Sequence, residues 1–400
     1  MRQEWRTVLL KDVLQPKGYI RGPFGSALKR GDMLDTGIPV YEQQHAIYGS
    51  RQFRFHISEN KYMEMKRFSI QPDDIIISCS GTVGKVSIIT KDDPIGIISQ
   101  ALLLLRVNVD IIDPLFLCYF FRSYEGYNAI VSRSSGSVQV NISKREVIEQ
   151  IPLRLPDIQT QRRIVSILNS LDQKIVCNAK INDNLQQQAV AIFRQWFSVN
   201  PESEKWPVVT LGRLTLLISR GIAPKYDDDS TQIVLNQKCI RDHYIDTLQA
   251  RRHKPKVINE KWLQYGDLLI NSTGEGTLGR AAQVWFVPEK MTVDSHVTII
   301  RPQNQLLLFY IGLWGISHER EIEALHTGST GQTELPRDRV KAMELRLPDN
   351  DTLTRFNAVI APMVSTIVVN QQENARLASV RDTLLPKLMS GEIDVSEIDI

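Results

Sequence analysis

The same sequence pattern occurs twice in the chain, and this repeat constrains the fold more than any other feature. Leu-Arg-Leu-Pro-Asp stands at 153–157 and returns at 345–349, 192 positions later. Upstream, PDDIIISCSGTVGK faces YGDLLINSTGEGTLGR, which places Asp74 on Asp267. Matched blocks in one order over so long a period indicate a duplicated structural unit. We therefore expect two copies of one fold within the 400 residues.

Each copy is predicted to begin with a globule of mixed α/β (α+β) structure. Short runs of β-branched and aliphatic residues, such as 75–77, 102–105 and 297–300, are separated by turns that contain glycine and proline. Such runs are typical of strands, and such turns are typical of the connections between them. The two globules are expected at 1–156 and 200–348.

Each copy then ends in a long segment with helical periodicity. No glycine or proline stands between 158 and 197, and apolar residues recur there at heptad spacing. The same spacing returns in the second copy. Heptad seams indicate a coiled coil, although an amphipathic helix packed on its own globule has a similar pattern. The helices are assigned to 157–199 and, with the tail of the chain, to 349–400.

Asparagines occupy equivalent seam positions of the two helical segments. They are Asn178, Asn182, Asn370 and Asn374. A buried polar layer lowers the stability of a coiled coil but fixes its register. Because each helix leaves its own globule, the second helix can pack on the first only if the two run antiparallel. The predicted fold is a pseudo-twofold dumbbell, with duplicated globules separated by two antiparallel helices. Pro362 within the second helix and Arg381 in its seam predict that this helix is looser than the first.

Composition and charge exclude several classes of protein. With 42% hydrophobic and 23% charged residues, the chain is neither disordered nor fibrous. A net charge of +3 is too small by itself to indicate a nucleic-acid surface. Four scattered cysteines and histidines without ligand spacing predict neither disulfides nor a metal site. The first residues lack the apolar core of a signal peptide and no long apolar run occurs, so we expect a cytoplasmic protein without a membrane partner.

Two motifs that would indicate catalysis are absent. An adenine methyltransferase needs an Asn/Asp-Pro-Pro-aromatic tetrapeptide, and the sequence contains no Pro-Pro. SGTVGK at 80–85 differs from the phosphate-binding G-x-x-x-x-G-K-[ST] motif, because its spacing is short and Val86 follows the lysine. We therefore expect no catalysis by this chain.

The helical motifs and the glycine-rich turns together match one known family. The main stretches are LRLPDIQTQRRIVSILNSLDQKIVCNAKINDNLQQQAVAIFRQWF at 153–197 and LLPKLMSGEIDV at 384–395. The shorter ones are GPFGSAL at 22–28, SGTVGK at 80–85, GEGTLGR at 274–280 and TGSTGQTEL at 327–335. With its order of globule, helix, globule and helix, essentially the whole chain resembles the specificity subunit of type I restriction-modification systems.

The resemblance implies a function and a set of partners. Each globule would be a target-recognition domain that binds one half of a bipartite sequence in double-stranded DNA, and the helices would set the half-site spacing. The implied partners are two methyltransferase subunits that modify adenine N6 and restriction subunits that translocate DNA. S-adenosylmethionine, ATP and Mg²⁺ would belong to these partners, with no cofactor bound by this chain. The alternatives are a scaffold that assembles proteins without reading DNA and, more remotely, a single-chain nuclease or methyltransferase.

Contacts with DNA phosphates are expected from two kinds of segment. The glycine-rich turns would present backbone amides together with Lys85 or Arg280, unless these turns serve only as hairpins. The second globule also carries a basic run, for which a solvated loop is the alternative. Its candidate residues are Arg251, Arg252, Lys254 and Lys256.

Contacts with bases are expected from polar triplets after the first long strand of each globule. The triplets are Gln43, Gln44 and His45 in the first globule and Asn236, Gln237 and Lys238 in the second. Amide side chains pair with adenine and lysine contacts guanine in the major groove. Because the two glutamines at Gln44 and Gln237 are shared, the differing residues His45 and Lys238 suit specificity better. Ser329 and Gln332, with the corresponding SGSVQ at 135–139, are further candidates unless these segments simply turn.

Overall fold

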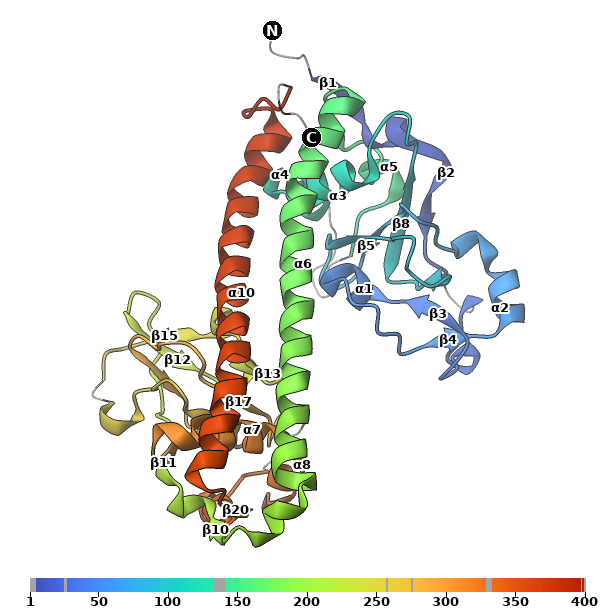
Figure 1. The fold of residues 1–400 in the computed structure, drawn as a ribbon. Helices are drawn as coiled ribbons and strands as arrows, with labels where there is room; N and C mark the ends of the chain where they lie inside the picture. Colours follow the sequence, from blue (N-terminus) through green and yellow to red (C-terminus); the bar gives the residue numbers. More distant parts are fainter. Residues whose placement is uncertain are drawn as a thin grey trace. The chain divides into compact units, whose positions relative to one another are not determined.

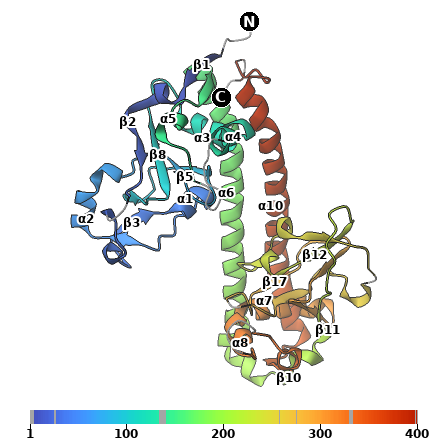
Figure 2. The ribbon, with the colours of Figure 1, turned by 180° about the vertical axis from the view of Figure 1, so that it is seen from behind.

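A computed structural model describes residues 5–24, 27–132, 141–256, 258–274, 276–328, 333–396 and 398 (Figures 1 and 2). Its contacts form two compact units. Unit 1 contains Met1–Ile175 and Ala375–Ile400, and unit 2 contains Val176–Asn374. Each unit therefore includes one globule and part of each long helix. The division of the chain into four segments at the helix ends stays a prediction. SGSVQ, Ser329 and Gln332 lie outside the described residues.

Unit 1 is built on a four-stranded antiparallel sheet and a smaller three-stranded sheet. The larger sheet has the order β2 (Leu14–Arg21), β8 (Leu102–Val107), β5 (Ile75–Ser78) and β6 (Val86–Ile88). The smaller has the order β4 (His56–Ile57), β3 (Ile38–Tyr41) and β7 (Ile97–Ile98), and β1 (Arg6–Leu9) pairs with β9 (Pro152–Leu155). The short helices are α1 (Gln43–Tyr48), α2 (Glu59–Glu64), α3 (Pro114–Arg122), α4 (Tyr124–Val131) and α5 (Arg145–Ile148).

Unit 2 repeats these sheets in the same order. The larger is β11 (Thr215–Arg220), β19 (Val297–Pro302), β16 (Leu268–Asn271) and β17 (Ala281–Gln283). The smaller is β15 (Arg251–His253), β12 (Gln232–Leu235) and β18 (Met291–Val293), and β10 (Val208–Thr210) pairs with β20 (Glu344–Arg346). The helices are α7 (Leu308–Ser317), α8 (Glu319–Ala324) and α9 (Arg337–Lys341), and a hairpin, β13 (Ile240–Arg241) with β14 (Tyr244–Ile245), is added.

Strand register confirms the predicted duplication. Ile75 pairs with Leu105 in the larger sheet of unit 1, and Leu268 pairs with Ile300 at the equivalent place in unit 2. Both sheets are fully antiparallel, and in both small sheets the central strand pairs with one antiparallel and one parallel neighbour. Two units with one topology and one register are copies of a single fold.

A buried ion pair crosses the larger sheet of each unit. In unit 1, Arg106 donates from Nε and Nη2 to Asp74 at 2.8 and 2.7 Å. In unit 2, Arg301 donates in the same way to Asp267 at 2.8 and 2.8 Å. Both carboxylates are fully buried. The repeat pairs the two aspartates, but the arginines that accompany them follow no motif and were not predicted.

The two long helices are α6 (Ile158–Arg194) and α10 (Asn350–Ser390), and α6 continues as a π-helical turn at Gln195–Val199. The aspartate of each Leu-Pro-Asp accepts hydrogen bonds from the backbone and the hydroxyl of the threonine three residues later. The repeated pentapeptide is therefore a strand followed by a helix N-cap. In unit 1 the start of α6 lies beside the end of α10 (Figures 1 and 2).

The apolar side of each helix enters the core of the unit to which it belongs. In unit 1, Ile164 and Leu168 of α6 and Leu388 of α10 share a core with α3. In unit 2, Phe193 of α6 and Phe356 of α10 share a core with α7. The helices therefore pack both on each other and on a globule, so both readings of the heptad pattern hold. By length and apolarity alone α10 would also suffice to cross a membrane, and 28% of its most apolar window is buried within the described structure.

The seam asparagines form interhelical hydrogen bonds within unit 2. Asn178 donates to Asn374 Oδ1 at 2.9 Å, and Asn370 donates to Asn182 Oδ1 at 2.8 Å. In unit 1, Arg381 donates to Asp172 Oδ1 on α6 at 2.8 Å. Arg381 therefore links the helices, because its charge has a partner across the seam, and the looser second helix stays a prediction.

Substitution of Asn182 by leucine is expected to destabilise unit 2 by about 1–3 kcal/mol, because the Asn370 amide loses its partly buried acceptor. The double variant Asn182→Leu/Asn370→Leu should recover most of that loss, since both polar partners are then replaced. Urea unfolding measures both values. Asn184→Leu on the exposed side of α6 is the control and should change stability by less than about 0.5 kcal/mol. A single variant as stable as this control would contradict the role of the polar layer.

Candidate nucleic-acid interface

The polar triplet of unit 1 forms the first turn of α1, directly after β3. His45 is fully buried, with its ring stacked on Phe53 at a centroid distance of 4.7 Å. Its Nδ1 lies 2.7 Å from the Glu42 amide nitrogen and its Nε2 lies 3.1 Å from the Gln52 carbonyl oxygen. With both ring nitrogens engaged, His45 holds the following loop in place. The prediction that it reads a base is contradicted by its burial, whereas Gln43 and Gln44 are half-exposed.

The polar triplet of unit 2 occupies a short 3-10 turn at Gln237–Cys239. The side-chain amide nitrogen of Gln237, Nε2, donates to the carbonyl and hydroxyl oxygens of Thr273. The Asn236 side chain accepts from the Lys238 backbone at 2.8 Å, so it caps the turn. Gln237 therefore lacks the free donor that bidentate adenine recognition needs, which corrects that prediction. Lys238 is exposed and remains available for a base or a phosphate.

The glycine-rich turn of unit 1 connects β5 to β6. Gly84 has φ 83° and its amide donates to the Ser78 carbonyl oxygen, so the turn is a hydrogen-bonded hairpin connection. A side chain there would meet Tyr127 and Val131 at 3.3 Å. Lys85 follows this turn and is exposed, with its Nζ 4.6 Å from the centre of the Tyr127 ring. The hairpin reading therefore holds, and a phosphate contact by Lys85 stays a prediction, as it does for Arg280.

A hollow of about 490 Å³ opens beside Lys85 within unit 1. Arg122 and Arg381 line it together with Tyr48 and Tyr124, whose side chains are 79% and 83% exposed. Both arginines are within 3.3 Å of Asp172, which offsets part of their charge. Exposed aromatic rings beside cations are typical of surfaces that bind nucleic acid. The sequence does not predict that these tyrosines lie together, because they are scattered along the chain.

The basic run of unit 2 is in part an edge strand, β15, which corrects the loop alternative for Arg251 and Arg252. Arg251 stacks on Tyr226 at 3.6 Å, and Arg252 donates to the Ser230 carbonyl oxygen at 2.6 Å. Lys254 and Lys256 follow the strand and are exposed. Burial lowers the pKa of the intervening His253, so that its imidazole adds no charge at neutral pH. The run thus places two cations on the edge strand and two directly after it.

Comparison with known proteins finds similarity to one family. Residues 3–187 match the model of the type I restriction modification DNA specificity domain. The MjaIX specificity subunit of Methanocaldococcus jannaschii, a type I restriction enzyme component, is 25% identical over 71% of this chain and 70% of its own length. The HindI specificity subunit of Haemophilus influenzae is 22% identical over 78% of this chain and 84% of its own length. The chain is therefore similar to the specificity subunits of type I restriction-modification systems.

A solved structure supports the fold of this chain. The type I restriction-modification S subunit from M. genitalium superposes with a TM-score of 0.59 at 14% identity, covering 97% of this chain and 96% of that chain. The predicted class, two α/β domains with long helices, is therefore confirmed. In the described part of this chain, no group of three or more His, Cys, Asp and Glu side chains is arranged to hold a metal ion.

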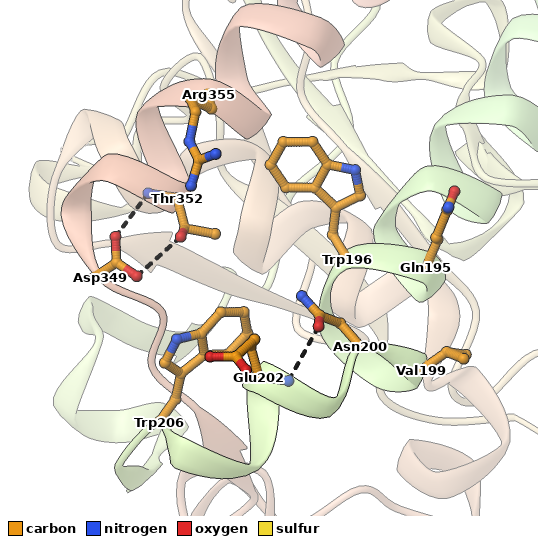
Figure 3. A pocket seen from close by; sticks show the side chains of 9 residues that line it. All are labelled: Gln195, Trp196, Val199, Asn200, Glu202, Trp206, Asp349, Thr352 and Arg355. Carbon is orange, nitrogen blue, oxygen red and sulfur yellow. Dashed lines mark hydrogen bonds between the residues drawn. The ribbon is translucent and has the colours of Figure 1, made fainter.

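Unit 2 has a hollow of about 640 Å³ where α6 ends and α10 begins (Figure 3). Trp196 and Trp206 face it, while Asp349 and Thr352 form the N-cap of α10 at its side. Unit 1 has a corresponding hollow of about 710 Å³, in which Trp5 and residues 390–395 take part. Half-buried tryptophans in a hollow are typical of surfaces that contact another protein. The repeat has kept this feature in both units.

Proposed function

We propose that this specificity subunit binds double-stranded DNA at a bipartite target, with one half-site for each unit. The observation that carries the proposal is that one scaffold, duplicated in register, bears different exposed groups at equivalent places. Lys238 of unit 2 is exposed where unit 1 has the buried His45, and the cationic edge strand β15 corresponds to the short β4. Equal scaffolds with unequal polar surfaces suit the reading of two different sequences.

The long helices are proposed to set the half-site spacing and to bind the methyltransferase subunits. Helices of 37 and 41 residues are about 55 and 60 Å long at 1.5 Å per residue. The tryptophan hollows at the helix ends, one in each unit, suit two copies of one partner. Restriction subunits would join the same complex.

Catalysis is proposed to reside in the partners, which would bind S-adenosylmethionine, ATP and Mg²⁺ in the cytoplasm. A scaffold that reads no DNA is the alternative function. Gel shifts with the methyltransferase partner present separate the two, because a scaffold would show no preference for any DNA sequence.

Substituting Lys254 or Lys256 by glutamine is expected to weaken binding to all DNA sequences alike. Removal of one phosphate-binding cation should make the slope of log K against log salt about 0.9 less negative. Fluorescence titration over a salt series measures the slope. Lys66→Gln is the control, because this exposed lysine of unit 1 lies outside the basic run and outside the hollow beside Lys85. Slopes equal to this control for both variants would remove the basic run from the interface.

A further inference from the structure

Arg21 and Arg220 occupy the same position in the two units. Arg21 ends β2 and pairs with Leu103, and Arg220 ends β11 and pairs with Thr298. The next residue is a glycine in both, and its amide donates to the neighbouring strand at 3.0 Å in unit 1 and 3.1 Å in unit 2. Strand register therefore makes the two arginines equivalent, although their separation in sequence differs from that of the main repeat.

The residues that face these arginines are also equivalent, but their charges differ. Asn141 forms a β-bridge with Ser80 in unit 1, and Glu334 forms the corresponding bridge with Thr273 in unit 2. The backbone amide of the residue after Asn141 or Glu334 donates to the carbonyl oxygen of the residue before Ser80 or Thr273. The distance is 2.9 Å in unit 1 and 2.8 Å in unit 2. A neutral amide in unit 1 thus stands where unit 2 has a carboxylate.

The difference decides whether the arginine has a counter-charge. Arg220 Nη1 lies 2.6 Å from Glu334 Oε1, and its Nη2 donates to the Leu335 carbonyl oxygen at 3.0 Å. Arg21 Nη1 is buried and has no hydrogen-bond partner among the described residues. A buried guanidinium nitrogen without a partner costs free energy, which an anion at this position would recover.

Other charges around Arg21 favour an anion. Arg21 opens into a hollow of about 940 Å³ in unit 1. Lys144, Arg145 and Glu146 also line it, and Arg145 is paired with Glu149 at 2.7 Å, so that Arg21 and Lys144 carry the excess positive charge. Ser80 and Asn141 add polar side chains, and the Ser80 hydroxyl donates to Asn141 Oδ1 at 2.9 Å. The hollow is therefore a cationic recess with hydrogen-bonding groups at its side.

We propose that this recess of unit 1 binds a phosphodiester of the DNA backbone, and that unit 2 fills the equivalent place with its own Glu334. The proposal deepens the proposed function and rests on it. The Glu334 carboxylate of unit 2 occupies the place that the phosphate would take in unit 1, because carboxylate and phosphate oxygens accept from a guanidinium in the same geometry. Arg21 takes the phosphate charge, and Lys144 adds electrostatic attraction. The two units then differ in how they hold the backbone as well as in the bases they face.

Asn141→Glu tests the proposal by giving unit 1 the carboxylate of unit 2. Its side chain should pair with Arg21 and exclude the phosphate. In the full chain with its methyltransferase partner, the affinity for every duplex is expected to fall about fivefold at 0.15 M salt, with a salt slope about 0.9 less negative. Asn60→Glu, at an exposed position of α2, makes the same change of net charge and should leave the slope unchanged.

A double-mutant cycle locates the effect at Arg21. Arg21→Gln should reproduce the loss seen with Asn141→Glu, and the double variant should lose no more than either single variant. Additive losses, or an Asn141→Glu slope equal to that of Asn60→Glu, would overturn the proposal. Thermal unfolding checks that each variant is folded, and Asn141→Glu should match the wild type because unit 2 accommodates the same pair.

The same titrations separate this proposal from the proposed function. If the wild-type complex prefers one DNA sequence while Asn141→Glu behaves as its control, the function stands and the Arg21 site is wrong. If the wild type shows no sequence preference but Asn141→Glu still reduces the slope, the half-site function is wrong and Arg21 remains a phosphate contact. Inorganic phosphate added to 10 mM should compete only weakly, since a single charged contact gives little affinity without the rest of the duplex.

Discussion

Exchange of residues 1–156 for the corresponding globule of another specificity subunit is expected to replace one half of the DNA target and to leave the other half unchanged. The expectation follows from the separate sheets and cores of the two units, since no strand of unit 1 pairs with a strand of unit 2 in the described structure. A gel shift with duplexes that carry the old and the new half-sites measures the result. Loss of the original half-site should exceed a hundredfold in affinity, because several mismatched base pairs each cost about 1–3 kcal/mol.

The graft must preserve the seam between globule and helices, because unit 1 continues beyond residue 156. Ile164 of α6 and Leu388 of α10 belong to its core, and the Tyr119 hydroxyl donates to Asp172 Oδ2 at 2.9 Å. Tyr119 should therefore be retained in the incoming globule. The reciprocal exchange of 200–348 is the matched control and should change the other half-site. Binding that ignored both exchanges would contradict the assignment of one half-site to each unit.

Removal of the buried carboxylate in Asp267→Ala is expected to cost unit 2 about 3–5 kcal/mol, since it leaves a buried guanidinium without its counter-charge. The Arg301 side chain is only 10% exposed, and water cannot replace the carboxylate there. Guanidinium unfolding followed by tryptophan fluorescence reports mainly on unit 2, which contains all the tryptophans except Trp5.

Two further variants place this value in context. Asp74→Ala removes the equivalent carboxylate of unit 1 and should destabilise that unit by a similar amount, followed by circular dichroism. Asp351→Ala breaks an ion pair with Arg355 in which both side chains are largely exposed, and it should cost less than about 1 kcal/mol. A loss of stability for Asp267→Ala no greater than that for Asp351→Ala would contradict the stabilising role of the buried ion pair.

The structural features that the sequence predicts correctly are those in which a physical pattern repeats along the chain. The pentapeptide of the repeat marked a strand and a helix N-cap, and heptad spacing located both long helices. The asparagines at seam positions proved to be hydrogen-bonded across the helices, because a polar residue in an apolar stripe must find a partner once it is buried. These features depend on local periodicity, which the sequence states directly.

Side-chain orientation was harder to predict. His45 and Gln237 were polar residues at the end of a strand, yet tertiary contacts turn one into the core and bind the other to the neighbouring turn. Their orientation is set by partners distant in sequence, such as Thr273. The sequence does not predict the Arg21 recess either, because the equivalence of Arg21 and Arg220 follows from strand register and not from a motif. The shared glutamines did carry a usable signal, since a residue needed by the scaffold is kept in both copies.

The central claim is that each unit reads one half of a divided DNA target. Mapping N6-methyladenine across the genome of a host with and without this chain, in the presence of its methyltransferase partner, tests this claim most directly. We predict one motif that depends on the chain, made of two specified half-sequences with a fixed unspecified spacer, and its disappearance when the chain is deleted. A methylation pattern that is unchanged by the deletion, or a single uninterrupted motif, would contradict the account.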